Sequence, residues 1–258
     1  MKIVLIGSGN VAESLAQVIA ETDGLQLVEV YARNEERGRK VAEMAGSEWS
    51  NTELREADLY LISVSDRAVE EVAQSLHIPE GAVVAHTAGC CPIDALAPHT
   101  HRAVFYPFQT FSVGRKVEFS KLYIFLEAAT DHALECVREV AQRLTPKVEM
   151  ADSARRAVVH LSGVFACNFV NAMYANASEI LATAELPFDV VAPVIEETAA
   201  KALSVRNPRQ IQTGPARRGD TPTLLRHKAM LEGEERKRRI YDEISNDIWE
   251  QRETSKRF

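Results

Sequence analysis

The most constraining feature of the sequence is a glycine-rich turn between a strand pattern and a helix pattern. Residues 2–6 form a short, mostly apolar run, and residues 10–21 repeat apolar side chains at helical spacing. The turn and the start of the helix read Gly7-Ser8-Gly9-Asn10-Val11-Ala12, which fits G-x-G-x-x-A in the strand–turn–helix context that this motif requires. The chain is therefore expected to begin with an α/β unit built around this turn.

Each small residue of the turn has a chemical purpose. Gly7 permits the tight turn, Gly9 lets the backbone approach a diphosphate, and Ala12 allows the helix to pack closely on the sheet. The helix N-terminus also offers free N–H groups and a partial positive charge to phosphates. The motif therefore predicts dinucleotide binding. The residues expected to contact the cofactor are Gly7, Ser8, Gly9, Asn10, Val11 and Ala12.

The end of the second expected strand, residues 25–31, indicates which dinucleotide binds. NAD-binding proteins place an acidic residue there for the ribose 2′-hydroxyl, but Glu29 comes too early in this strand. Arg33 offers a guanidinium suited to a 2′-phosphate, and Asn34 can add a hydrogen bond. The sequence therefore predicts NADP as the cofactor. Arg37 and Arg39 can assist, although arginines on helix surfaces are usually only solvated.

The remaining pattern predicts an α/β Rossmann-like doubly wound sheet followed by a mostly α-helical C-terminal domain. Apolar strand patterns alternate with helices up to about residue 130, and a single helical pattern then covers residues 152–185, with Asp152 or Ser153 as its N-cap. We expect an NADP-binding Rossmann-like domain at residues 1–150 and a helical substrate and dimerisation domain at residues 151–258.

Ligands of doubly wound sheets bind beyond the carboxyl ends of the strands, which identifies further candidates. Val64, Ser65 and Thr87 are expected at the cofactor, and Gln109 and Thr110 at the substrate. Hydride transfer also needs a proton donor, for which His86 and His160 are candidates. At about 100° per residue, His160, Asn168 and Asn171 share one helical stripe and can face a cleft, with Asn168 in the catalytic group and Asn171 at the substrate.

A loop rich in proline, glycine and arginine, residues 207–220, supplies the last candidates. Arg218 can clamp a substrate carboxylate, which favours a small, anionic metabolite; an Arg218–Asp220 or inter-subunit ion pair that fixes the loop is equally compatible. Asp220 and His227 join Arg218 as expected substrate-binding residues.

Composition limits the other functional classes. The 30 basic and 37 acidic side chains give a net charge of −7, which does not favour nucleic acid as a partner. The four cysteines form no C-x-x-C pair, so no metal site is expected. The first apolar run is too short for a signal peptide, and no uninterrupted apolar stretch of membrane-spanning length is evident, so a cytoplasmic location without membrane association is expected.

The later motifs carry a resemblance over nearly the whole chain. The sequence resembles bacterial NADP oxidoreductases that join a Rossmann-like domain to a helical domain of unknown function. This family is related to 6-phosphogluconate, 3-hydroxyisobutyrate and prephenate dehydrogenases, ketopantoate reductase and pyrroline-carboxylate reductase. The resemblance implies an NADP-dependent oxidoreductase and a homodimer built on the helical domain. Besides the glycine turn, it rests on Ser63-Val64-Ser65-Asp66, His86-Thr87-Ala88-Gly89, Tyr106-Pro107-Phe108-Gln109-Thr110-Phe111, Asn168, Thr213-Gly214-Pro215, Arg218-Gly219-Asp220-Thr221 and His227.

One departure keeps the catalytic residues open. Several relatives carry a catalytic lysine one turn before the helical asparagine, where this chain has Val164, and Tyr106 stands where several relatives have histidine. The leading interpretation is hydride transfer between NADP(H) and a small metabolite. The alternatives are a non-catalytic NADP-binding sensor or scaffold, and an NADP reductase of a deazaflavin or flavin.

Overall fold

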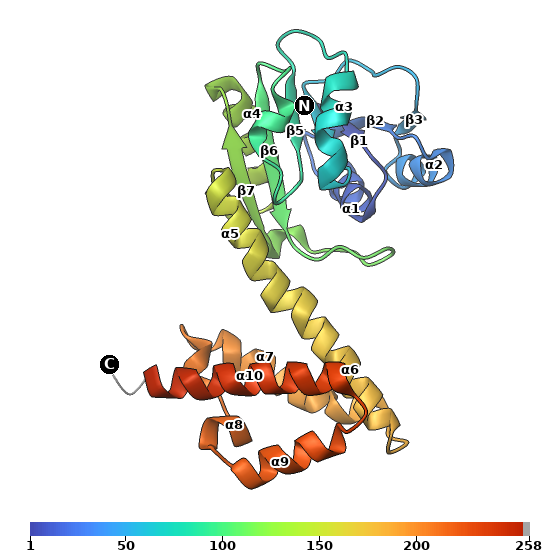
Figure 1. Cartoon of the computed structure of the whole chain (residues 1–258). Helices are drawn as coiled ribbons and strands as arrows, with labels where there is room; N and C mark the ends of the chain where they lie inside the picture. Colours follow the sequence, from blue (N-terminus) through green and yellow to red (C-terminus); the bar gives the residue numbers. More distant parts are fainter. Residues whose placement is uncertain (255–258) are drawn as a thin grey trace. The chain divides into compact units, whose positions relative to one another are not determined.

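The computed structural model describes residues 1–254, which divide into two compact units, Met1–Phe169 and the residues from Val170 onward. All strands of the described residues belong to the first unit, and the second unit is helical (Figure 1). The α/β fold class expected from the sequence is confirmed. The boundary between the units lies inside a long helix, whereas the boundary expected from the sequence lies just before it. The roles assigned to residues 1–150 and 151–258 stay predictions.

The first unit is built on an eight-stranded sheet with the order β3-β2-β1-β4-β5-β6-β7-β8. Neighbouring strands are parallel except for the antiparallel pair β6 and β7. The strand order reverses at β1, which pairs with β2 on one side and β4 on the other. Such a reversal opens a crevice at the carboxyl ends of the strands. The strands are β1 (Lys2–Ile6), β2 (Gln26–Tyr31), β3 (Glu48–Ser50), β4 (Leu59–Ile62), β5 (Val83–His86), β6 (Arg102–Phe108), β7 (Tyr123–Ala128) and β8 (Val148–Met150).

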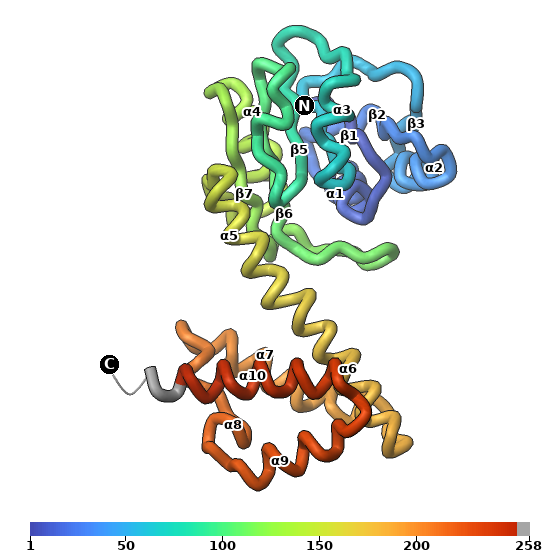
Figure 2. Tube along the Cα trace, in the orientation of Figure 1, coloured from blue at the N-terminus to red at the C-terminus, as the bar shows by residue number. Residues whose placement is uncertain are grey.

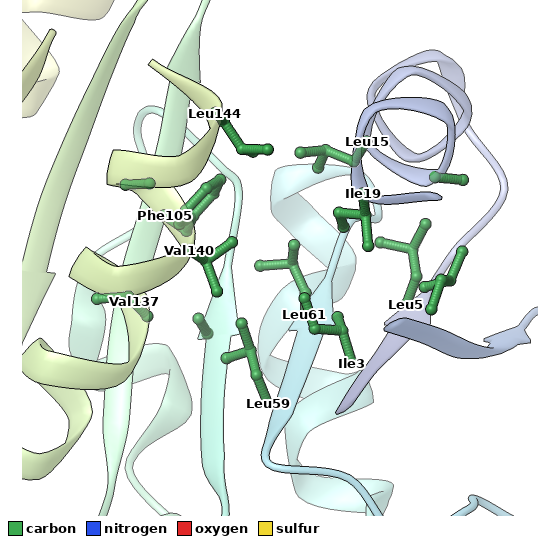
Figure 3. Packing of buried hydrophobic residues seen from close by; sticks show 14 of the residues in the cluster. Ile3, Leu5, Leu15, Ile19, Leu59, Leu61, Phe105, Val137, Val140 and Leu144 are labelled. Carbon is green, nitrogen blue, oxygen red and sulfur yellow. The ribbon is translucent and has the colours of Figure 1, made fainter. Parts of the chain in front are cut away.

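Helices cover both faces of this sheet because successive side chains of a buried strand point to opposite faces. In β1, Ile3 and Leu5 belong to one apolar cluster, and Val4 and Ile6 belong to a second. Figure 3 shows the first cluster, in which Leu15 and Ile19 of α1 and Val137, Val140 and Leu144 of α4 lie over the sheet. The helices of this unit are α1 (Asn10–Ala20), α2 (Glu35–Met44), α3 (Val69–Ser75), α4 (Asp131–Leu144) and α5 (Ser153–Gly163).

Polar side chains cap the N-termini of three of these helices. Asn34, Thr130 and Asp152 each accept a backbone hydrogen bond at the start of α2, α4 and α5, which satisfies one of the orphan N–H groups of the first turn. The choice between Asp152 and Ser153 as the N-cap of the long helix is therefore settled in favour of Asp152. Ser153 instead donates to Glu127 of β7, which fixes the first turn of α5 against the sheet.

The second unit contains five helices among the described residues. Between residues 170 and 251, only Ala216 and Leu231 are buried, and large apolar side chains such as Val194, Leu225 and Met230 are more than 60% exposed. A set of helices this poorly buried has little apolar core of its own. The helices are α6 (Val170–Ala182), α7 (Ala192–Leu203), α8 (Pro215–Arg218), α9 (Thr221–Met230) and α10 (Glu235–Thr254).

Four features differ from the expectations drawn from the sequence. The short edge strand β3 was not expected, and the expected loop 207–220 contains the helical turns Pro208–Ile211 and α8. The long helix also passes through a π-helical segment, Val164–Phe169. By length and composition, the continuous helix Ser153–Ala182 is the one helix of the described residues that could cross a membrane, although no such stretch was expected.

Candidate functional site

A cavity of about 790 Å³ lies at the carboxyl ends of the parallel strands, where the strand order reverses. The glycine turn, the residues after β2, β4 and β5, the end of β6 and one residue of α5 line it. Of the expected cofactor residues, all except the buried Ala12 line the cavity. These are Gly7, Ser8, Gly9, Asn10, Val11, Arg33, Asn34, Val64, Ser65 and Thr87. Ala12 lies fully buried under the turn, as its packing role requires.

The two glycines of the turn meet different steric limits. Gly7 has a φ of +123°, its N–H donates to Tyr31 O at 2.9 Å, and a Cβ there would lie 2.2 Å from the carbonyl oxygen of Ser63. Gly9 has an ordinary φ of −76°, and a Cβ there would meet no atom within 4 Å. The space left open above Gly9 faces the cavity at the N-terminus of α1, where a diphosphate is favoured. The turn therefore fits a dinucleotide.

The end of β2 supplies one available cation. Arg33 is exposed and lines the cavity, and no acidic side chain of residues 1–251 forms an ion pair with it. Arg39 pairs with Glu35 at 2.8 Å and lies 4.3 Å from the ring centre of Trp49, so it is engaged elsewhere. The side-chain oxygen of Asn34 caps α2, which leaves only its NH₂ group for a ligand. Arg33 is therefore the residue positioned for a 2′-phosphate.

A tyrosine and a histidine meet at the opposite side of the lining. The hydroxyl of Tyr106 on β6 lies 3.2 Å from Nδ1 of His160 on α5, within hydrogen-bond distance, and both side chains line the cavity. A Cβ on Gly89 would lie 2.5 Å from that Nδ1 and 2.9 Å from the hydroxyl, so the pair needs glycine at this position. Burial, followed by the charges of Cys90 and Asp66, raises the pKa of Tyr106 to about 12. Tyr106 is therefore protonated at neutral pH.

His86, the other histidine candidate, lies beneath the cavity rather than in it. Its side chain is fully buried, its Nδ1 accepts from Ala88 N at 3.2 Å, and it is not among the lining residues. Burial, followed by the charge of Arg156, lowers the pKa of His86 to about 4. His86 ends β5, and its buried ring does not line the cavity, so the structure gives no support to its expected acid–base role, which stays a prediction.

A loop after β6 is hydrogen-bonded to the first turn of α1. Residues 109–118, which follow β6 in green in Figure 2, are held by Asn10, whose NH₂ group donates to Phe111 O at 3.1 Å. Glu13 accepts from Gly114 N at 3.3 Å. Gln109 lines the cavity as expected, whereas Thr110 is exposed and lies outside the lining. Tyr106, Gly89 and this fastening were not anticipated, since they depend on contacts between distant segments.

The remaining candidates are Asn168 and residues of the second unit. Asn168 is exposed in the π-helical segment and does not line the cavity, and its expected role stays a prediction. The wider turns of that segment change the spacing of about 100° per residue on which the expected stripe with His160 and Asn171 rests. Asn171 and Arg218 are residues of the second unit. There, Asp220 caps α9 through Thr223 N, and Nδ1 of His227 lies 2.9 Å from the hydroxyl of Tyr241.

Metal binding has no support among the described residues, in which no cluster of three His, Cys, Asp or Glu side chains could hold an ion. Cys90 and Cys91 are free thiols, one exposed and one buried. Burial raises the pKa of both thiols, which keeps them in the less reactive protonated form. The chemistry available at the cavity is therefore dinucleotide binding beside a tyrosine–histidine pair.

Family comparisons agree with this arrangement. Residues 2–89 match the family described as NADP oxidoreductase, coenzyme F420-dependent, and residues 122–248 match a domain of unknown function (DUF2520). A solved structure from Bacteroides fragilis, of a protein proposed to be an NADP oxidoreductase, is 38% identical to this chain. It covers 96% of this chain and 98% of its own length, with a TM-score of 0.90.

More distant structures share the fold. A protein from Thermotoga maritima is 22% identical, with 97% of this chain and 99% of that chain covered and a TM-score of 0.83. A reductive aminase from Aspergillus terreus, solved with NADPH and ethyl-5-oxohexanoate, is 13% identical, with 99% and 93% covered and a TM-score of 0.67. The comparison with curated proteins gives no match.

Proposed function

Because this chain belongs to the NADP oxidoreductases that combine an F420-dependent-type N-terminal domain with a C-terminal domain of unknown function, and its cofactor is NADP, we propose that it is a reductase of small carbonyl or imine compounds. The observation that carries the proposal is the Tyr106–His160 pair, which lines the same cavity as the glycine turn. Hydride chemistry needs a proton donor close to the cofactor, and this pair supplies one.

Binding follows from groups already positioned before the cofactor arrives. The N–H groups at the start of α1 bind the diphosphate, and Gly9 leaves room for it. Arg33 pairs with the 2′-phosphate through a charge-assisted hydrogen bond, for which its planar guanidinium is suited. Bound NADPH supplies the hydride. Asn10 holds the loop of residues 109–118 in place, and two residues of this loop, Gln109 and Phe111, line the cavity.

Proton transfer is assigned to Tyr106. As the carbon of the acceptor gains the hydride, the hydroxyl of Tyr106 donates its proton to the oxygen or nitrogen that gains the electron pair. The tyrosine oxygen then regains a proton by way of His160, through the 3.2 Å contact. The raised pKa of Tyr106 suits this order, because the hydroxyl keeps its proton until the acceptor becomes strongly basic.

The test is single-turnover oxidation of NADPH against a panel of small ketones, aldehydes and cyclic imines. Tyr106→Phe is expected to slow the hydride step by about 100-fold or more, within the range that general acid catalysis contributes. Tyr123→Phe is the matched control, because Tyr123 is an exposed tyrosine on the neighbouring strand β7, outside the cavity. Equal rates in the two variants would refute the role of Tyr106.

Two alternatives give different results in the same assay. A non-catalytic sensor or scaffold binds NADPH but oxidises it with no member of the panel. A reductase of a deazaflavin or flavin is favoured by the description of the family that matches residues 2–89, and it predicts NADPH oxidation with FMN or a deazaflavin but not with the small compounds.

A homodimer completes the proposal. The exposed apolar side chains of the helical unit and of the helix Ser153–Ala182 need a covering surface, and a second copy of the chain offers a complementary one. This assignment keeps the helix out of a membrane and the protein in the cytoplasm, with no nucleic-acid partner. Light scattering of protein purified without detergent is expected to give twice the chain mass of 28.6 kDa, and a monomeric mass would refute the dimer.

A further inference from the structure

The charged side chains that line the cavity are unevenly distributed. Besides the imidazole of His160, they are one guanidinium, Arg33, and two carboxylates, Asp66 and Glu71. Arg33 follows β2 and is assigned to the 2′-phosphate of the cofactor. Asp66 begins the helical turn after β4, and Glu71 lies on α3. Once the cofactor is bound, the carboxylates therefore dominate the remaining lining charge.

Asp66 and Tyr106 line the same cavity. The negative charge of Asp66 is one of the groups that raise the pKa of Tyr106, after burial and Cys90, and it also acts on the thiols of Cys90 and Cys91. Glu71 does not contribute to the shift of Tyr106. Among the side chains that the structure describes, residues 1–251, none forms an ion pair with the carboxylate of Asp66 or donates a hydrogen bond to it. It is exposed and available to a ligand.

Arg156, whose charge acts on Tyr106, is already engaged and does not line the cavity. Arg156 is fully buried, forms an ion pair with Glu127, and donates to the carbonyl oxygen of Cys91 at 2.5 Å and to Ser153. Breaking a buried ion pair of this kind leaves an uncompensated charge, so Arg156 is not free to bind a ligand. Apart from the imidazole of His160, the lining of the first unit therefore presents unpaired carboxylates, and Arg33 is its one guanidinium.

We propose that the substrate carries a positively charged nitrogen, and that Asp66 binds it as an imine in its protonated form. This inference rests on the proposed function and replaces the anionic metabolite suggested by Arg218 in the sequence. A carboxylate near an imine favours its protonated form, which is the more electrophilic one. The assignment explains why an unpaired carboxylate, which would repel an anionic substrate, stands at the reacting end of the cavity.

The reaction balances with the groups named. The carbon of the C=N⁺ bond accepts the hydride, a C–H bond forms, and the π electrons move to nitrogen as its positive charge is lost. The neutral amine then takes a proton from the Tyr106–His160 pair and becomes an ammonium ion, which pairs again with Asp66. Substrate and product both carry a positive charge, so a single carboxylate binds each of them.

The test uses three ring probes of similar size and different charge on the full-length protein saturated with NADP⁺. Cyclopentylamine is cationic at neutral pH, cyclopentanol is neutral, and cyclopentanecarboxylate is anionic. Calorimetry is expected to show the amine binding at least tenfold more tightly than the other two. Asp66→Asn is expected to remove this preference, with the affinity for NADPH changed less than twofold, while Glu71→Gln, the matched control, retains it.

Other outcomes overturn the inference. For the wild type, these are tighter binding of cyclopentanecarboxylate, no preference for cyclopentylamine, or no binding of any probe. For the variants, they are an equal loss of the preference in Glu71→Gln, or a weakened NADPH affinity in Asp66→Asn, which would assign Asp66 to the cofactor. Titration with NADPH is done first, so a failure of cofactor binding, which refutes the proposed function, is distinguished from a failure of charge selection.

Discussion

Replacing Gly9 with alanine separates cofactor binding from folding. A Cβ at this position would meet no protein atom within 4 Å, and the backbone φ of −76° suits alanine. Alanine is a poorer N-cap than glycine by up to about 1 kcal/mol. Its lower entropy in the unfolded chain offsets roughly 0.4–1 kcal/mol. The free energy of unfolding is therefore expected to stay within about 0.5 kcal/mol of the wild type.

Binding should respond much more strongly. The added methyl group occupies the open space at the start of α1, so a diphosphate oxygen must move away from the N–H groups it would accept from. Loss of one charge-assisted hydrogen bond costs about 1.5–3 kcal/mol, which corresponds to roughly a 10- to 100-fold higher Kd for NADPH. Fluorescence titration with NADPH and urea denaturation of the same preparation measure the two effects.

Gly7→Ala provides the contrast. Its φ of +123° disfavours alanine, and its Cβ would lie 2.2 Å from Ser63 O, so we expect a loss of about 3–5 kcal/mol in the free energy of unfolding. At roughly 2–4 °C per kcal/mol, the Tm should fall by about 10 °C. If Gly9→Ala binds NADPH as the wild type does, or unfolds as easily as Gly7→Ala, the reasoning about this turn is refuted.

Three further predictions test other parts of the site. Arg33→Ala should raise the Kd for NADPH by about 10- to 100-fold and leave that for NADH unchanged, with Arg39→Ala, engaged by Trp49, as an unaffected control in the same titration. The lowered pKa of His86, about 4, stabilises the fold above pH 6.5. This stability, about 3 kcal/mol, should be lost as the pH falls to 4, and urea unfolding of His86→Asn should show a smaller loss over that range. Asn10→Ala should release residues 109–118, so that trypsin cleaves after Arg115 faster than in the wild type; unchanged cleavage would contradict the fastening.

Much of the fold follows from local patterns in the sequence. Apolar runs of four to seven residues, separated by helical patterns, are enough to place the strands and helices of the first unit, and the strand–turn–helix context identifies the cofactor turn. The assignment of Arg33 to the 2′-phosphate depends on a single position just after β2, where proteins with this glycine turn hold the ribose of the cofactor. The NADP cofactor and the family were accordingly predicted correctly.

The Tyr106–His160 pair, the proposed proton donor, was harder to predict because it is a tertiary contact. Tyr106 and His160 are 54 residues apart and meet only because β6 and α5 lie beside Gly89. His86 has the correct position at a strand end, yet strand alternation turns its side chain inward, and a pattern of residue types does not reveal that direction. The π-helical segment changes the register after Gly163, so spacing calculated for an ideal α-helix misplaces Asn168.

The measurement that tests the central claim most directly is calorimetric titration of the full-length wild-type protein with NADPH and with NADH. The account predicts one NADPH bound per chain, with an affinity at least tenfold higher than that for NADH. Equal affinities would contradict the role of Arg33, and the absence of binding by either nucleotide would contradict the assignment of the cavity itself.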